Sequence, residues 1–265
     1  METPVILSIA GSDCSAGAGA QADLKTGLAL GCYPLTALSC VVSEVPGCVA
    51  GIEPMPPEFV RSQIELCLSR FPVRAAKCGM LYSPDIIAAV AETLAARAPQ
   101  LPLVVDPVMV ATAGEPLMQR AALSAYQKRL FPRATLLTPN CDELTVLLGD
   151  ARRIDSEEQL AAAATELVQR LGCAVLAKGG HLRGDDCTDI LALPGEPLRR
   201  YRHPRSCGIS THGTGCTLSA AVTAGLAQGR DLPEAVERAL HYTARAIARS
   251  HRWGTVDALC HRAED

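Results

Sequence analysis

The residues best suited to chemistry lie in a glycine-rich segment, Ser210–Thr217, which precedes a run of small residues typical of a helix. Glycines that lead into a helix N-terminus present backbone N–H groups and the positive end of the helix dipole, which together bind anions such as a phosphoryl group in transfer. Cys216 falls in the first helical turn, where the dipole is expected to lower the thiol pKa from about 8.5 toward neutrality. The segment predicts an anion hole with a cysteine that accepts a proton. The alternative is a buried cysteine that packs a helix start.

A second polar segment, Thr138–Glu143, follows an apolar run that is typical of a strand. Asn140 and Glu143 are three residues apart, so they share one face of a helical turn. An amide oxygen and a carboxylate are hard ligands that suit Mg²⁺, directly or through its waters. The alternative is a capping box, with Asn140 as the N-cap and Glu143 at the third helical position.

Three further segments are weaker signals, because each is also typical of an ordinary turn after a strand. Gly11–Gly19 is rich in glycine but has neither the spacing of a dinucleotide fingerprint nor the Gly-Lys-Ser/Thr of a Walker loop. Lys178–His181 ends another strand and would bring Lys178 near a phosphate. Asp106–Met109 offers a further carboxylate for the waters of a metal ion.

Short apolar runs alternate with amphipathic stretches, a pattern typical of parallel strands covered by helices. The sequence therefore predicts an α/β fold, a doubly wound and mostly parallel sheet between helices, as a single domain over residues 1–265. In such sheets the ligand lies beyond the carboxyl ends of the strands, where all the polar segments above would meet. The expected strands are Val5–Ala10, Pro34–Val42, Ala75–Gly79, Leu103–Asp106, Thr135–Thr138 and Ala174–Lys178, with a hairpin of Cys187–Leu193 and Arg199–His203. The expected helices are Gly19–Leu30, Pro57–Arg70, Pro84–Arg97, Ala121–Leu130, Ser156–Arg170, Gly215–Gln228 and Pro233–Ala248.

Composition narrows the class of protein further. The 265 residues are 48 % hydrophobic and 20 % charged, with a formal net charge of -3 and no basic stripe, which argues against nucleic acid as a partner. No apolar run reaches the roughly 18 residues of a membrane span, and no signal peptide is visible. The 12 cysteines show no C-x-x-C pair, and all but Cys216 are expected to be small buried hydrophobes. A reducing, cytoplasmic setting fits these thiols.

Taken together, the motifs resemble those of the hydroxymethylpyrimidine/phosphomethylpyrimidine kinases of the ribokinase-like superfamily, over nearly the whole chain. The matching segments are Gly11–Asp13, Gly17–Gly19, Gln21–Thr26, Lys77–Leu81, Asp106–Met109, Thr138–Glu143, Lys178–His181 and His212–Thr217. The resemblance implies a ribokinase-like fold, ATP and Mg²⁺ as cofactors, and a homodimer. It also implies two phosphorylations, of 4-amino-5-hydroxymethyl-2-methylpyrimidine and then of its monophosphate, in thiamine biosynthesis.

The resemblance further implies roles for individual residues. Sugar kinases of the superfamily carry aspartate as the base in the anion hole, whereas this family and this chain carry cysteine. The anion hole and base would be Gly213, Thr214, Gly215 and Cys216. The metal site would be Asn140 and Glu143, with Asp106 in the outer shell. The acceptor pocket would be Gly11, Asp23, Glu44, Met80 and Val108, and the nucleotide side Lys178, His181 and Thr211.

Two departures from the family pattern bear on the acceptor. Glu44-Val45-Pro46 stands where the family usually has Gln-Asn-Thr, and an ionised Glu accepts hydrogen bonds but donates none. Thr112 stands where the family has a lysine, so one cation is missing from the segment Thr112–Pro116, which we expect to close over the site. The alternatives are therefore a pyridoxal kinase on the same fold and a non-catalytic pyrimidine sensor, although a sensor has no need of a base beside an anion hole.

Overall fold

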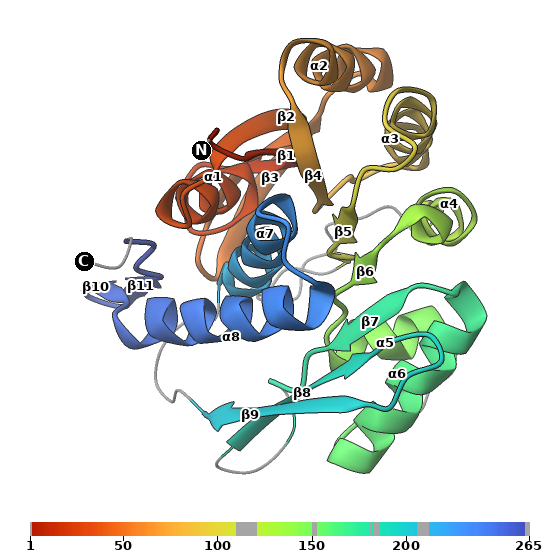
Figure 1. Ribbon diagram of the computed structural model, residues 1–265. Coiled ribbons are helices and arrows are strands. Elements are labelled where there is room, and N and C mark those ends of the chain that lie inside the picture. The colour runs from red at the N-terminus through yellow and green to blue at the C-terminus, as the bar shows by residue number, and fades with distance from the viewer. Residues whose placement is uncertain are drawn as a thin grey trace.

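A nine-stranded sheet forms the centre of the computed structural model, which describes residues 2–109, 121–149, 153–180, 182, 186–205 and 212–262. Within these ranges the strand order is β3-β2-β1-β4-β5-β6-β7-β8-β9 (Figure 1). The strands are β1 (Val5–Asp13), β2 (Tyr33–Val45), β3 (Cys48–Pro54), β4 (Val73–Cys78), β5 (Leu103–Val105), β6 (Leu136–Leu137), β7 (Ala174–Ala177), β8 (Asp186–Ala192) and β9 (Arg199–Pro204).

The six strands from β2 to β7 in this order are parallel, and antiparallel strands lie only at the two edges. β3 pairs with β2 at one edge, and the expected hairpin of β8 and β9 extends the sheet from β7 at the other. The mostly parallel sheet predicted from the sequence is therefore confirmed.

Helices cover both faces of the sheet, as Figure 1 shows. One face carries α1 (Gly19–Ala29), α7 (Thr214–Ala227) and α8 (Leu232–Ala248); the other carries α2 (Pro57–Arg70), α3 (Pro84–Arg97), α5 (Cys141–Leu148) and α6 (Glu157–Leu171). Successive strand residues enter opposite cores, as a strand period of two requires. Val104 and Leu136 pack under α7 and α8, whereas Val105 and Leu137 pack in the core on the other face.

The structure departs from the expected elements in five places. α5 (Cys141–Leu148) was missing from the expected helices, although Asn140 and Glu143 were expected to share a helical turn. β1 runs through Gly11 to Asp13, so the start of the first glycine-rich segment is strand with a register shift at Gly11. The helix expected over Ala121–Leu130 is a short α4 (Ala122–Ala125) followed by a π-helical turn η1 (Tyr126–Leu130) and a 3-10 turn η2 (Phe131–Arg133). β3 and the hairpin of β10 (His251–Trp253) and β11 (Val256–Ala258) were not predicted, because their residues are mostly exposed and show no apolar alternation.

All eleven cysteines that the structure describes are free, as expected. Two of them contradict the expectation of burial: Cys14 and Cys48 are exposed, because they lie at the end of β1 and on the edge strand β3. Among the described helices, none combines the length and the apolar character that crossing a membrane requires.

Candidate active site

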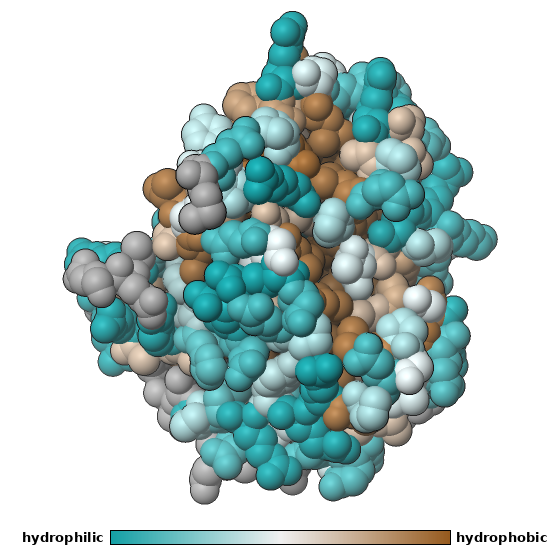
Figure 2. Space-filling view, viewed as in Figure 1, coloured by the Kyte–Doolittle hydropathy of each residue, from teal (hydrophilic) through white to brown (hydrophobic). Residues whose placement is uncertain are grey.

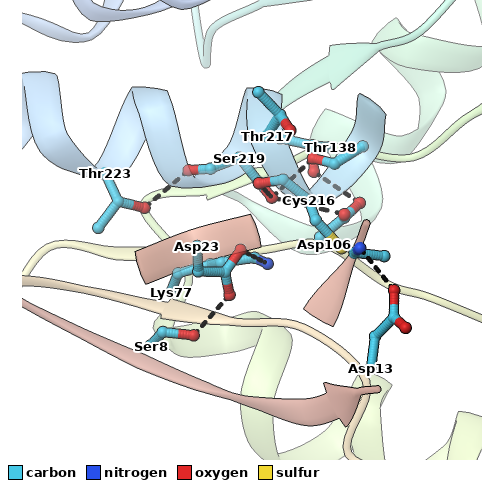
Figure 3. Close-up of polar contacts among 12 residues, drawn as sticks. Ser8, Asp13, Asp23, Lys77, Asp106, Thr138, Cys216, Thr217, Ser219 and Thr223 are labelled. Atoms are coloured by element: carbon cyan, nitrogen blue, oxygen red, sulfur yellow. Dashed lines mark hydrogen bonds and ion pairs between the residues drawn. The ribbon is translucent and has the colours of Figure 1, made fainter. Parts of the chain in front are cut away.

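The expected site residues that the structure describes come from the carboxyl ends of β1, β2, β4, β5, β6 and β7, from α1, and from the N-terminus of α7. Asp106 follows β5, Asn140 follows β6, and Lys178 follows β7, where it forms an isolated parallel bridge with Asn140. Figure 3 shows Asp106 and Thr138 close to Cys216 at the beginning of α7. The sequence-based expectation that these segments meet at one edge of the sheet is confirmed.

The N-terminus of α7 is built around Gly213, the N-cap residue, whose φ is 83°. A Cβ atom there would lie 1.9 Å from the carbonyl oxygen of Gly17, so only glycine allows the two glycine-rich turns to touch. Gly213 has no side chain of its own to cap the helix, and no acidic residue occupies the first turn. The backbone N–H groups of this turn, with the positive end of the helix dipole behind them, suit an anion.

Cys216 lies in this first turn with its side chain partly exposed. The expected lowering of its thiol pKa was wrong. Burial raises the pKa of Cys216 to about 11, the Lys77 ammonium lowers it in part, and the carboxylates of Asp23 and Asp106 raise it further. Loss of water around the sulfur outweighs the helix dipole, because desolvation disfavours the charged thiolate. At neutral pH the unliganded protein therefore holds Cys216 as a thiol.

Lys178 joins the helix mouth to the carboxylates beneath it. Its Nζ lies 3.0 Å from Asp106 Oδ1 and 3.9 Å from Glu143 Oε2. A Cβ on Gly215 would lie 3.2 Å from Asp106 Oδ2 and 3.3 Å from Lys178 Nζ, so the missing side chain lets this ion pair approach the first turn of α7. Thr138 donates a 2.9 Å hydrogen bond to Asp106 Oδ1. Burial raises the pKa of Asp106, but Lys178, Lys77 and these hydrogen bonds outweigh it and lower the pKa overall.

Asn140 and Glu143 form the capping box of α5 that the sequence offered as the alternative to a metal site. The Asn140 side chain accepts the N–H of Glu143, and Glu143 Oε2 accepts the N–H of Asn140 at 2.8 Å. Burial raises the pKa of Glu143 to about 7, although Lys178 opposes the shift.

The two side chains can serve both purposes, because an amide oxygen accepts two hydrogen bonds and a carboxylate accepts about four. Their remaining lone pairs fit a Mg²⁺ ion held through its own waters. Among the described residues no group of three His, Cys, Asp or Glu side chains is arranged to hold a metal ion directly. The donor set therefore fits outer-sphere binding of Mg²⁺ beside a phosphate.

A small apolar cluster, a candidate wall for the acceptor, lies next to β1. Cys40 and Met80 are buried there, with Val108 packed against them. A Cβ on Gly11 would lie 2.8 Å from Cys40 Sγ and 3.5 Å from Met80 Sδ. Three of the expected acceptor residues, Gly11, Met80 and Val108, are thus brought together.

Glu44 lies nearby on β2, half-buried, and its carboxylate has no hydrogen-bond or ion-pair partner among the described residues. Burial raises the pKa of Glu44, the Asp13 carboxylate raises it further, and His212 lowers it.

Asp23 does not join that wall. Its carboxylate is fully buried and is bonded to Lys77 Nζ at 2.6 Å and to Ser8 Oγ at 2.5 Å. The expectation that Asp23 lines the acceptor pocket does not match this placement, because both of its oxygens are held inside the protein and none of its surface is accessible.

Sequence reasoning also missed a contact between the two glycine-rich turns. Asp13, at the end of β1, accepts hydrogen bonds from the N–H groups of Ser15 and Ala18, both at 2.7 Å, and lies 2.9 Å from His212 Nε2. Burial raises the pKa of Asp13, but the hydrogen bonds from His212, Ser15 and Ala18 outweigh it and lower the pKa to about 2. Asp13 and His212 are 199 residues apart in the chain. The one sequence signal for this contact was that each residue belongs to a glycine-rich segment.

Some expected residues are not part of the described site. His181, Thr211, the segment Thr112–Pro116 and Cys207 lie outside the described residues. A cavity of about 450 Å³ opens between α1, α7 and α8, lined by Gly225, Arg238 and Tyr242 among others. It lies toward the C-terminal end of α7 and contains none of the expected residues.

A mostly parallel sheet with helices on both faces and an anion site at its carboxyl edge defines the class: a ribokinase-like α/β kinase fold. The structure of the pyridoxal kinase from Staphylococcus aureus in complex with AMP-PCP and pyridoxal is similar, with a TM-score of 0.89 and 34% identity. The match covers 99% of this chain and 95% of that one.

The family model described as phosphomethylpyrimidine kinase matches residues 13–261, and the chain belongs to this family of kinases. The hydroxymethylpyrimidine/phosphomethylpyrimidine kinase of Streptomyces coelicolor is 43% identical over 244 residues, 92% of this chain and 88% of that protein. The thiamine biosynthesis bifunctional protein ThiED of Geobacter sulfurreducens is 44% identical over 243 residues. That match covers 91% of this chain and 49% of ThiED, so the chain spans about half the length of that relative. The family expected from the sequence motifs is confirmed.

Proposed function

We propose that this kinase transfers the γ-phosphoryl group of ATP to the hydroxymethyl oxygen of 4-amino-5-hydroxymethyl-2-methylpyrimidine. In a second round it phosphorylates the monophosphate to the diphosphate, as a step of thiamine biosynthesis. The observation that carries the proposal is the glycine-led N-terminus of α7, which holds Cys216 beside the Lys178–Asp106 pair. The likeness to the Streptomyces coelicolor kinase supports the choice of acceptor.

In the proposed reaction Cys216 first loses its own thiol proton to solvent, and the thiolate that results takes the proton of the acceptor hydroxyl. The freed oxygen bonds to the γ-phosphorus, the bond from that phosphorus to the β,γ-bridging oxygen breaks, and ADP leaves. The backbone N–H groups of Gly213, Thr214 and Gly215 hold the equatorial oxygens of the moving group, where charge accumulates. Gly213 and Gly215 are required because any side chain would push the turn away from Gly17 or from the Lys178–Asp106 pair.

The neighbouring residues bind and orient the phosphates. Lys178 neutralises phosphate charge, and Asn140 and Glu143 hold Mg²⁺ through its waters with Asp106 in the outer shell. When bound, the metal ion would supply positive charge that offsets the charge developing on the phosphates. On the nucleotide side, roles for His181 and Thr211 remain predictions from the resemblance.

The acceptor ring packs against Gly11, Met80 and Val108, with Glu44 at its polar edge. The unpaired carboxylate of Glu44 supports this assignment, because it is half-buried and free to accept hydrogen bonds from an exocyclic amine. We assign Asp23 a different role, described below.

Pyridoxal is the second candidate acceptor, since the Staphylococcus aureus pyridoxal kinase superimposes on nearly the whole chain. The test is an ATP-consumption assay with three acceptors in parallel: the hydroxymethylpyrimidine, its monophosphate and pyridoxal. We expect turnover with both pyrimidines and a kcat/KM for pyridoxal lower by about tenfold or more. Turnover with pyridoxal alone would replace the proposal by its alternative, and ligand binding without ADP release would identify a sensor.

The matched control for this assay is Cys216→Ala. Because the residue supplies the base but little binding surface, we expect kcat to fall by about 10²–10⁴-fold while the Kd of ATP stays near the wild-type value. Turnover at the wild-type rate would remove Cys216 from the mechanism.

We also propose that residues 1–265 act as one kinase domain in a cytoplasmic homodimer. One continuous sheet from β3 to β9 and the free cysteines support the domain and the compartment. Figure 2 shows apolar surface near α1 and between α2 and α3, whereas the surface along α8 is hydrophilic. α1 and α2 also carry the exposed Leu28, Phe59 and Leu66. Light scattering coupled to gel filtration distinguishes a dimer from a monomer.

A further inference from the structure

A lysine and an aspartate are paired between the sheet and α1, below α7. Lys77 on β4 and Asp23 on α1 are both 1% exposed, and Lys77 Nζ lies 2.6 Å from Asp23 Oδ1. Ser8 on β1 donates a 2.5 Å hydrogen bond to the other oxygen of Asp23. Buried pairs of this kind seldom stabilise a fold more than apolar residues of similar volume would, so the pair calls for another explanation.

The strand register points the pair toward the candidate active site. Ser8 and Lys77 are partners across the parallel β1–β4 ladder, so both side chains leave the sheet on the same face, the one that α1 and α7 cover. A Cβ on Gly79 would lie 3.3 Å from Lys77 Nζ, so the Lys77 side chain runs along β4 toward the carboxyl edge of the sheet. In Figure 3, Lys77 and Asp23 lie together below the first turns of α7, near Cys216.

We infer that Lys77, fixed by Asp23 and Ser8, is a positioning residue that supplies the positive charge opposite the Cys216 sulfur when that sulfur carries negative charge. The inference deepens the proposed function and rests on it for its role in turnover. Asp23 holds the lysine in place from below, which accounts for its burial and for its absence from the acceptor pocket.

The charges around Cys216 agree with this arrangement. Lys77 on β4 and Lys178 after β7 face it as cations, while Asp23 on α1 and Asp106 after β5 face it as anions. Of these groups Lys77 has the largest effect on the sulfur, and it lowers a thiol pKa that burial has raised. Lys77 itself stays charged, because Asp23, Cys216 and Asp106 raise its pKa despite burial.

The experiment measures alkylation of Cys216 by iodoacetamide as a function of pH, resolved to the single residue by tandem mass spectrometry. Cys216 is a partly exposed residue in the first turn of α7, and the exposed Cys48 on β3 serves as the reference in the same sample. Asp23→Asn removes the anion but keeps the shape and the bond to Ser8. Asp23→Asn/Lys77→Met then removes the cation without leaving a buried unpaired carboxylate, so the two variants differ only in Lys77.

We expect Asp23→Asn to alkylate Cys216 faster than the wild type, and Asp23→Asn/Lys77→Met to alkylate it at least about tenfold more slowly than Asp23→Asn at pH 8. The reason is that each unit of thiol pKa changes the thiolate fraction tenfold below the pKa. A pair that only supported the fold would move both variants in the same direction. Thr93→Val, which removes a buried hydroxyl on α3 at the opposite face, controls for packing damage.

Equal rates in the two Asp23 variants, within twofold, would overturn the inference. If the double variant does not fold, Asp23→Asn/Lys77→Gln is measured in its place, with the same expected slowing relative to Asp23→Asn. The alkylation needs neither ATP nor an acceptor. A kinase assay without turnover on any acceptor would therefore contradict the proposed function and leave the alkylation result unchanged.

In the kinase assay, the double variant should lose about tenfold in kcat relative to Asp23→Asn, with the KM for ATP unchanged. The rising limb of its kcat–pH profile should shift to higher pH by the amount seen in alkylation. A loss of kcat without that shift would contradict a role through Cys216.

Discussion

Gly213→Ala tests whether the close contact of the two glycine-rich turns creates the anion hole. At a φ of 83°, an alanine is strained by about 1–2 kcal/mol. Its Cβ would also lie 1.9 Å from the carbonyl oxygen of Gly17, well inside any allowed contact, so one of the two backbones must retreat by more than about 1 Å. A displacement of that size at a reacting centre costs about 100-fold in rate, and we expect at least that loss in kcat.

Gly229→Ala is the matched control, since Gly229 follows the other end of α7 with a φ of 81° and has nothing within 4 Å of the Cβ position. This variant should lose only the backbone strain, which lowers Tm by roughly 2–4 °C per kcal/mol, and should keep the wild-type kcat. The assays are thermal unfolding and ATP consumption with the hydroxymethylpyrimidine. A Gly213→Ala enzyme whose kcat stays within threefold of Gly229→Ala would refute the reasoning.

Three more predictions concern single side chains of the site. The pKa of Glu143 is raised to about 7, so folding takes up a proton between the ordinary pKa of a glutamate and pH 7, and the free energy of unfolding falls as pH rises through this window. In Glu143→Gln, measured by urea unfolding from pH 4.5 to 7.5, this dependence on pH should flatten. An unchanged dependence would contradict the prediction. Since the pKa of Glu44 is raised and its carboxylate accepts from the exocyclic amine, the wild-type KM for the pyrimidine should fall as pH rises and Glu44 ionises. Glu44→Gln should give a flat profile, and parallel profiles would exclude the contact. Met80→Ala removes a side chain packed beside Val108, so it should cost about 2–5 kcal/mol of stability and raise the acceptor KM about tenfold, with the KM for ATP as the internal control.

Local sequence signals were sufficient for much of the fold. The predicted bounds of α2 (Pro57–Arg70) and α3 (Pro84–Arg97) match the structure, because each begins with a proline in its first turn and ends near an arginine. The edge strand β3 was missed because its residues are exposed or half-exposed on both sides, so no apolar alternation marked it.

The site was predictable in its backbone and much less so in its charges. Glycine spacing was enough to place the proposed anion hole at the start of α7. The protonation state of Cys216 could not be predicted, because burial at the start of α7 depends on the packing of distant segments, and the sequence shows only the helix dipole. Lys77 and Asp23 are 54 residues apart, and neither belongs to a phosphate-binding pattern, so nothing local marked them as a pair.

The charge balance of the buried site also bears on how the nucleotide enters. Within each of the two lysine–aspartate pairs the opposite charges largely cancel. Glu143 and Cys216 are therefore left as acids without a full counter-charge, and burial raises the pKa of both. Phosphates that entered alone would add negative charge and hold the Cys216 sulfur more firmly in its thiol form. Phosphates that enter with a divalent cation add much less net charge, and Mg²⁺ is usually held in this way, by one or two carboxylates and the phosphates of the substrate. In the proposed mechanism, ionisation of Cys216 and binding of the metal ion are therefore linked through the same local charges. A substitution that changes the charge at Glu143 should change the pKa of Cys216.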